Sequence, residues 1–246
     1  MRPRYAILIA AACVYIVGAY APFGHYILYP LTLFTTWVHE LGHGLSALAV
    51  GGRFESLDIY SDASGLAFAY GEPGWREGIV AAGGLLAPPI VGSALIAFVH
   101  GPRRARVVLA VLAAALVASL VVYVRSATGL VAMPIVAVAL AFTAWRGFAD
   151  HPYHRVVAVQ VLGVVLALDT LTRMVSYVFE DEVVIGGVKR PSDIHLVAEN
   201  FGGHYLLWGL AITALAVGLL GLSTWWAWSR SPVRHGLRSK HGRAST

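Results

Sequence analysis

The protein is 246 residues long; 58% of its residues are hydrophobic, only 13% are charged, and its formal net charge is +5. Soluble domains carry about 25% charged residues, so this chain has too little polar surface to cover a water-soluble globule of its size. The same composition excludes intrinsic disorder. A single cysteine, Cys13, excludes a secreted domain stabilised by internal disulfides. The composition therefore predicts a polytopic membrane protein.

Seven stretches of the chain meet or approach the length of about 20 apolar residues that a membrane span requires. They are residues 5–22, 26–50, 77–99, 107–124, 129–145, 155–179 and 204–228. The first has features of a signal peptide, but Pro22 after its small residues disfavours cleavage, so we expect a retained anchor. The third is interrupted by Gly83-Gly84 and Pro88-Pro89. We therefore expect an all-α polytopic protein with six or seven transmembrane helices.

The segments outside these stretches complete the expected domain organisation. Residues 53–70 alternate between apolar and polar side chains around a Ser-Asp-Ala-Ser-Gly run, which predicts a small β-hairpin after the second span. We expect residues 1–229 to form a single transmembrane domain and residues 230–246 a basic, disordered tail. Basic residues at both ends favour cytoplasmic termini, which requires an even number of crossings. A count of seven leaves the orientation undecided.

The composition and the positions of the basic residues also predict what the protein contacts. The chain is expected to be a multi-pass protein of the cell membrane, surrounded by the lipid bilayer. Its basic residues are confined to loops and the tail, and it has no folded basic motif, so we expect no binding of nucleic acid.

His39, Glu40 and His43 form a His-Glu-Leu-Gly-His motif inside the second predicted span. Positions four residues apart share a helix face, so both imidazoles can bind one metal ion. Glu40 lies about 100° around the helix, where it can act as the general base for a water molecule, as in zinc hydrolases. The competing interpretation is a cluster of buried, hydrogen-bonded histidines. A carboxylate in mid-span favours a functional site, because burying it there costs a few kcal/mol.

A catalytic zinc site normally has three protein ligands, so a third must come from elsewhere in the chain. Of the thirteen acidic residues, only Glu40 and Asp169 lie well inside predicted spans. At 1.5 Å per residue, the histidines lie roughly 20–25 Å into their span and Asp169 lies about 21 Å into its own. Asp169 is therefore the predicted third ligand, and its alternative role is an ion pair with Arg173 one turn later. Glu199, Asp193 and His204 are the other candidates.

The stretch Thr36–Gly44, followed by Ala47, Gly51-Gly52 and the hairpin, resembles the site-two protease family of membrane-embedded zinc metallopeptidases. It is most similar to the small branch that lacks PDZ and CBS domains. Residues 82–89, Asp169–Arg173 and Ser192-Asp193 also resemble that branch. One departure is that better-known members carry Asp-Gly at the third ligand, whereas Thr170 follows Asp169 here.

The resemblance implies intramembrane proteolysis, with one Zn²⁺ per chain held by His39, His43 and Asp169 and with Glu40 as the catalytic base. The substrate would be a membrane protein cleaved in or near a transmembrane segment. The hairpin at 53–70 would either pair with an extended substrate peptide or serve as a plain connector. The alternative function is a transporter or metal-handling protein that uses the same buried His and Asp residues.

Overall fold

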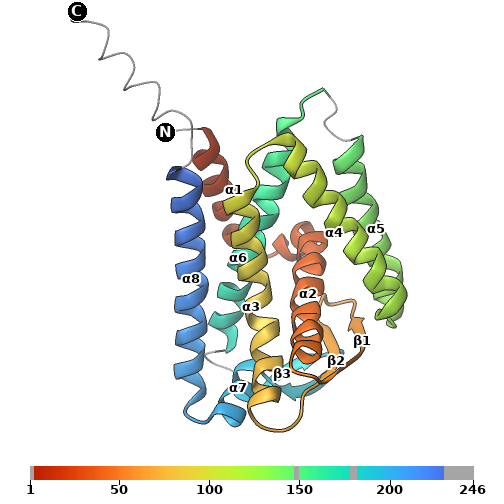
Figure 1. Cartoon of the computed structure of the whole chain (residues 1–246), viewed down its shortest axis with the longest axis vertical. Helices are drawn as coiled ribbons and strands as arrows, with labels where there is room; N and C mark the ends of the chain where they lie inside the picture. The colour runs from red at the N-terminus through yellow and green to blue at the C-terminus, as the bar shows by residue number, and fades with distance from the viewer. Residues whose placement is uncertain (1–2, 147–149, 178–181, 230–246) are drawn as a thin grey trace, which may run out of the picture.

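A computed structural model describes residues 3–146, 150–177 and 182–229, so the predicted tail, residues 230–246, lies outside the described residues. In these ranges the chain forms a helical bundle with two small hairpins at one end (Figure 1). The elements are α1 (Pro3–Tyr20), α2 (Gly24–Ala49), β1 (Arg53–Ile59), β2 (Gly65–Tyr70), α3 (Trp75–Phe98), α4 (Pro102–Val122), α5 (Ala127–Trp145), α6 (Tyr153–Tyr177), β3 (Glu182–Ile185), β4 (Val188–Pro191), α7 (Asp193–Phe201) and α8 (Tyr205–Ser229).

The predicted all-α membrane architecture and the hairpin after the second apolar stretch are confirmed. Every predicted span coincides with a long helix whose ends differ from the prediction by a few residues. Helix α3 runs unbroken through Pro88 and Pro89, although these residues were expected to interrupt it. The helices α4, α5 and α8 bury less than a third of their most apolar window within the protein, which leaves apolar faces suited to lipid.

Among the described residues the candidate crossings number five or six, against the six or seven expected. Helices α3, α4, α5, α6 and α8 are each long and apolar enough to span a membrane, whereas α1 and α2 qualify only together and are bent by 115°. The count is therefore five, or six if the bent pair forms one broken span. A Cβ at Gly24 would lie 1.7 Å from the carbonyl oxygen of Gly18, so the sharp bend depends on glycine. Two apolar stretches separated by such a bend look like two spans in the sequence.

The second half of α2 is held in the middle of the protein. Trp37 is 2% exposed, and its indole N–H donates a hydrogen bond of 2.8 Å to the Ser119 hydroxyl on α4. On the other side, α3 approaches α2 at glycines: a Cβ at Gly42 would lie 2.5 Å from the carbonyl oxygen of Gly83. The Gly83-Gly84 pair thus permits close helix packing rather than a break in the helix.

The first hairpin has one covered edge. Strands β1 and β2 are antiparallel, with Leu57 opposite Ala67. The outer side of β1 is bonded to the turn between α4 and α5: the Leu57 N–H donates to the Tyr123 carbonyl at 2.9 Å, and the Arg125 N–H donates to the Leu57 carbonyl at 3.2 Å. In the described residues β2 pairs only with β1. The edge of β2 that is not paired with β1 lines the cavity described below.

A second hairpin and a short helix form within the polar segment between α6 and α8, which the sequence indicated only as a link. Strands β3 and β4 pair antiparallel, and α7 follows directly. The hydroxyl of Ser192 caps α7 by accepting the N–H of His195. This cap fixes the first residue of α7, Asp193, at the start of the helix.

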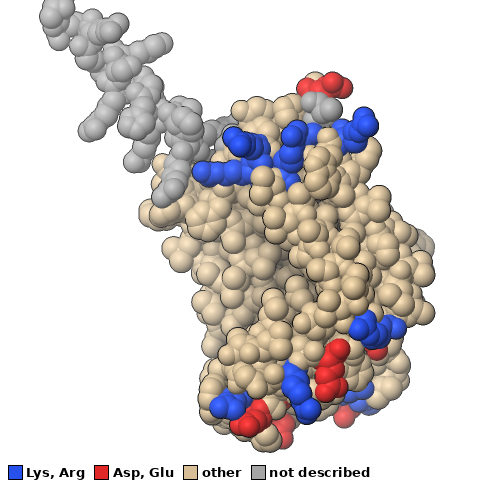
Figure 2. Space-filling view, turned by 45° about the vertical axis from the view of Figure 1, so that its right-hand side comes forward, with Lys and Arg blue, Asp and Glu red and all other residues tan. Residues whose placement is uncertain are grey.

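The two ends of the bundle differ in charge (Figure 2). Lys and Arg side chains form a band at the end where α3 meets α4 and α5 meets α6, with acidic side-chain atoms visible only at its tip, whereas the hairpin end mixes basic and acidic side chains. Both termini of the described chain lie at the basic end, because α1 begins there and α8 ends there.

Candidate metal centre

His39, Glu40 and His43 are buried, with 4%, 5% and 9% of each residue exposed. As the i, i+4 spacing predicts, the two imidazoles lie on one face of α2. Their rings meet edge-on, with centroids 4.8 Å apart and Nε2 atoms 3.2 Å apart. Both Nε2 atoms therefore point toward the same place.

Asp193 completes this group. Its Oδ2 lies 3.0 Å from Nε2 of His39 and 3.4 Å from Nε2 of His43. The three side chains form a group that could hold a metal ion, with ligand atoms within 4.8 Å of one another. Burial alone would raise the pKa of Asp193, but the charge of His43 and hydrogen bonds from both imidazoles outweigh it and hold the pKa well below its usual range. Asp193 is therefore a carboxylate.

The donor set fits a tetrahedral zinc ion. Ligand atoms at about 2.1 Å from such an ion lie about 3.4 Å from one another, and the three separations here are 3.0, 3.2 and 3.4 Å. The Nδ1 of His43 donates to the Val80 carbonyl at 2.8 Å, so Nε2 is the ring nitrogen directed at Asp193 and the one that a metal ion would bind.

Backbone groups of α3 fix the position of the His43 ring. The Val80 carbonyl on α3 orients the His43 ring, as carbonyls commonly do for metal-bound histidines. A Cβ at Gly84 would lie 2.1 Å from Nε2 of His43. A glycine at this place in α3 is thus required for the ring to occupy its position.

Glu40 is oriented by the hairpin. Its Oε2 accepts the backbone N–H of Ala67 on β2 at 2.8 Å. A Cβ at Gly65 would lie 2.6 Å from Oε1 of Glu40, so β2 approaches the carboxylate closely.

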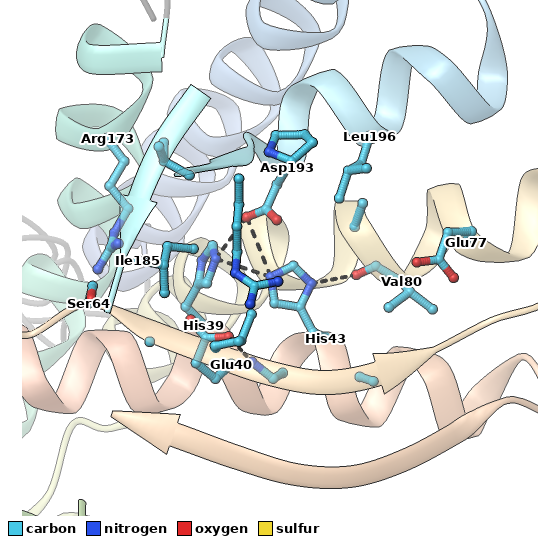
Figure 3. A pocket seen from close by; sticks show the side chains of 18 of the residues that line it. His39, Glu40, His43, Ser64, Glu77, Val80, Arg173, Ile185, Asp193 and Leu196 are labelled. Atoms are coloured by element: carbon cyan, nitrogen blue, oxygen red, sulfur yellow. Dashed lines mark hydrogen bonds and ion pairs between the residues drawn. The ribbon is translucent and has the colours of Figure 1, made fainter. Parts of the chain in front are cut away.

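A cavity of about 490 Å³ contains the whole group (Figure 3). The imidazoles and Glu40 lie on α2, Asp193 lies across from them at the start of α7, and Val80 and Glu77 are contributed by α3. Residues of β2 and of the second hairpin line the remaining walls. These include Gly65, Leu66 and Ala67 of β2 and Val183, Val184 and Ile185 of β3.

Asp169 does not join the group that the structure assembles. Its Oδ2 accepts the Arg173 Nε–H at 2.8 Å, and its Oδ1 accepts the hydroxyls of Thr35 and Tyr15 at 3.0 and 3.3 Å. The ion pair that was the alternative interpretation of Asp169 is therefore present. Asp169 contacts Thr35, one turn before His39 on α2, but depth along a helix does not determine which neighbours the side chain faces.

Of the other three candidates for the third ligand, only Asp193 lies beside the histidines. Glu199 is exposed on α7, and His204 is exposed and stacks on Tyr205. Asp193 was one of the candidates, but it was ranked below Asp169 because it lies outside the predicted spans. The signal for it was the Ser192-Asp193 pair, since Ser is a preferred helix cap and places the next residue at the first turn of a helix.

The sequence matches one known protein family over most of its length. The family model described as Peptidase M50B-like matches residues 5–223, which include His39, Glu40, His43 and Asp193. No curated protein and no solved structure matches the chain.

Proposed function

This chain belongs to the Peptidase M50B-like family, and we propose that it is a zinc-dependent endopeptidase that cleaves membrane proteins in or near a transmembrane segment. The family and the five to six apolar helices make it an integral, multi-pass membrane metallopeptidase. The observation that carries the proposal is the convergence of His39, His43 and Asp193 in the cavity that also holds Glu40. A transporter or metal-handling protein would not require a carboxylate between the two histidines.

We assign His39, His43 and Asp193 as the residues that hold one Zn²⁺, with Asp193 in the role first expected of Asp169. When bound, the ion supplies the Lewis acidity that activates a water molecule and polarises the scissile carbonyl.

Glu40 acts as general base and then as general acid in this proposal. Its carboxylate accepts the proton of the attacking water and passes it to the amine that leaves when the peptide bond breaks. The Ala67 N–H holds the carboxylate in one orientation during both transfers. The Val80 carbonyl does the same for the ring of His43.

The walls of the cavity support an extended substrate. A peptide bond within a helix is shielded by neighbouring turns, so the substrate must be locally unwound before attack. β2 lines the cavity, and in the described residues it pairs only with β1. An extended peptide can add to such an edge through main-chain hydrogen bonds.

The charge distribution supports an orientation in the cell membrane. At the basic end, where α1, α4 and α6 begin and α5 ends, the chain has Arg4, Arg103, Arg104, Arg106, Arg146 and Arg155. The sequence before Pro3 and after Ser229 contains six more basic residues, which are Arg2, Arg230, Arg234, Arg238, Lys240 and Arg243. At the hairpin end the chain has Arg53, Arg76, Arg125, Lys189 and Arg190. Basic residues accumulate on the cytoplasmic side, so the cavity would open toward the opposite side.

Site-directed labelling tests this orientation. With Cys13 replaced by Ser, single cysteines at Ser61, in the turn of the first hairpin, and at Gly101, at the basic end, are treated in intact cells with a membrane-impermeant maleimide. We expect labelling at position 61 and protection at position 101. Labelling of position 101 alone would reverse the orientation.

Metal analysis and chelation test the function itself. The full-length protein purified in detergent is expected to contain about one zinc per chain. A panel of doubly tagged single-span proteins, co-expressed with wild type or Glu40→Gln, identifies a substrate that only the wild type cleaves. We expect 1,10-phenanthroline to stop this cleavage in vitro and added zinc to restore it. Cleavage that survives complete removal of zinc would contradict the proposal.

A further inference from the structure

A buried network of polar side chains lies beside the metal centre and is not used by the mechanism above. Asp169 on α6 is 3% exposed and accepts hydrogen bonds from Arg173, from Thr35 on α2 and from Tyr15 on α1. Three helices thus meet at one carboxylate. Removing an ion pair from water and lipid headgroups is costly, and apolar side chains would join the helices equally well.

The cationic end of this network faces the cavity. The Asp169 side chain is 4% exposed, whereas that of Arg173 is 23% exposed and lines the cavity with His39 and Glu40. The network therefore presents a guanidinium to the space where the substrate would lie. In Figure 3 the Arg173 guanidinium lies near Ser64, on the side of His39 away from Glu77.

Two contacts on different nitrogens fix the plane of this guanidinium. Nε donates to Asp169, and Nη2 donates to the Thr36 hydroxyl at 3.0 Å. The Thr36 hydroxyl in turn donates to the Ala63 carbonyl at 2.8 Å in the turn before β2. Thr36 precedes Glu40 by four residues, so the guanidinium is bonded to a side chain about 6 Å along α2 from the proposed base.

We propose that Arg173 is a substrate-binding residue that donates a hydrogen bond to a main-chain carbonyl oxygen near the scissile bond, and that Asp169 is the positioning residue that holds it. This inference rests on the proposed function. A main-chain carbonyl is an oxygen that every extended substrate presents, whatever its side chains. The guanidinium supplies the charge-assisted donor that such an oxygen requires, and its neighbour β2 offers the edge along which the peptide would extend.

The test uses two hydroxamates that bind zinc through the same group. Acetohydroxamic acid has no peptide chain, whereas a tripeptidyl hydroxamate extends along the cavity. Their dissociation constants are measured by calorimetry on the full-length zinc-loaded protein in detergent. Arg173→Gln is expected to bind acetohydroxamic acid as wild type does and the tripeptidyl hydroxamate about 10–100-fold more weakly, the range for one hydrogen bond from a charged donor.

Replacing the peptide carbonyls one at a time by methylene groups identifies the partner of Arg173. One replacement should weaken binding to the wild type about 10–100-fold and leave binding to Arg173→Gln unchanged. Arg173→Lys should restore part of the loss, because it keeps the charge without the planar fork. Asp169→Asn should weaken the same ligand, and the double variant should be no weaker than Arg173→Gln.

Arg155→Gln is the control, since Arg155 is a second arginine of α6; it is buried and donates to the Thr143 carbonyl at the other end of the helix. We expect it to leave both affinities unchanged. If Arg173→Gln binds both hydroxamates as the wild type does, or if no carbonyl replacement distinguishes the two proteins, the role of Arg173 is refuted. Failure of acetohydroxamic acid to bind the wild type would instead refute the zinc centre.

Discussion

Replacing Glu40 by Gln is expected to abolish measurable peptide-bond cleavage while leaving about one zinc per chain in place. Gln keeps the size of the side chain but does not accept a proton, so the loss is that of general base catalysis, about 10²–10⁴-fold. Zinc should remain, because the atoms that converge on the site are contributed by His39, His43 and Asp193. Cleavage of the co-expressed substrate and the zinc content of the same preparation are measured together.

Glu77 provides a closely matched control. It is a second carboxylate lining the same cavity, and its Oε2 accepts the Gly71 N–H at 2.8 Å much as Oε2 of Glu40 accepts that of Ala67. It lies in the first turn of α3 and not between the histidines, so Glu77→Gln should retain most of the activity. Full activity in Glu40→Gln would exclude Glu40 as the base, and loss of zinc in that variant would make it a structural part of the metal site.

Replacing Asp193 by Ala is expected to deplete the protein of zinc. The change removes the only carboxylate oxygen of the group formed with His39 and His43. Loss of a residue that merely orients a metal ligand typically weakens metal binding about 10–100-fold, and loss of a ligand should exceed this. The measurement is the zinc content after equilibration against a chelating buffer, with activity assayed in parallel.

Asp169→Asn is the comparison that separates the two carboxylates. It should keep its zinc, because Asp169 is bonded to Arg173, Thr35 and Tyr15. It should instead lower the thermal stability, since breaking a buried ion pair costs about 3–5 kcal/mol. If Asp169→Asn lost zinc and Asp193→Ala kept it, the assignment of the third ligand to Asp193 would be wrong.

Much of the fold could be predicted from local patterns. The low charge and the lengths of the apolar stretches predicted the membrane class and seven of the eight helices in the described residues, because helix formation in a bilayer depends on local composition. The alternation at residues 53–70 predicted the hairpin that became β1 and β2. The second hairpin and α7 were missed, because their segment is polar and short and its structure depends on the packing of neighbouring elements.

The number of membrane crossings could not be predicted from the apolar stretches alone, because it depends on a bend between two helices. The sequence contains two apolar stretches at residues 5–22 and 26–50, each long enough to count as a span. The 115° bend between α1 and α2 makes them at most one, and it depends on the contact between Gly18 and Gly24. The count is then five, or six if the bent pair is one span, and α1 begins at the same end of the bundle at which α8 ends.

The sequence by itself determined the membrane setting and the unit of His39, Glu40 and His43, since positions one and four residues apart on a helix have a fixed relation whatever surrounds them. Only the tertiary structure decided which carboxylate joins the histidines. Asp169 lies at a suitable depth on α6 but faces Arg173, whereas α7 packs back over the cavity and brings Asp193 within 3.0 Å of His39. The direction in which a side chain faces and the return of a polar segment over the site are properties of packing, and no local pattern encodes them.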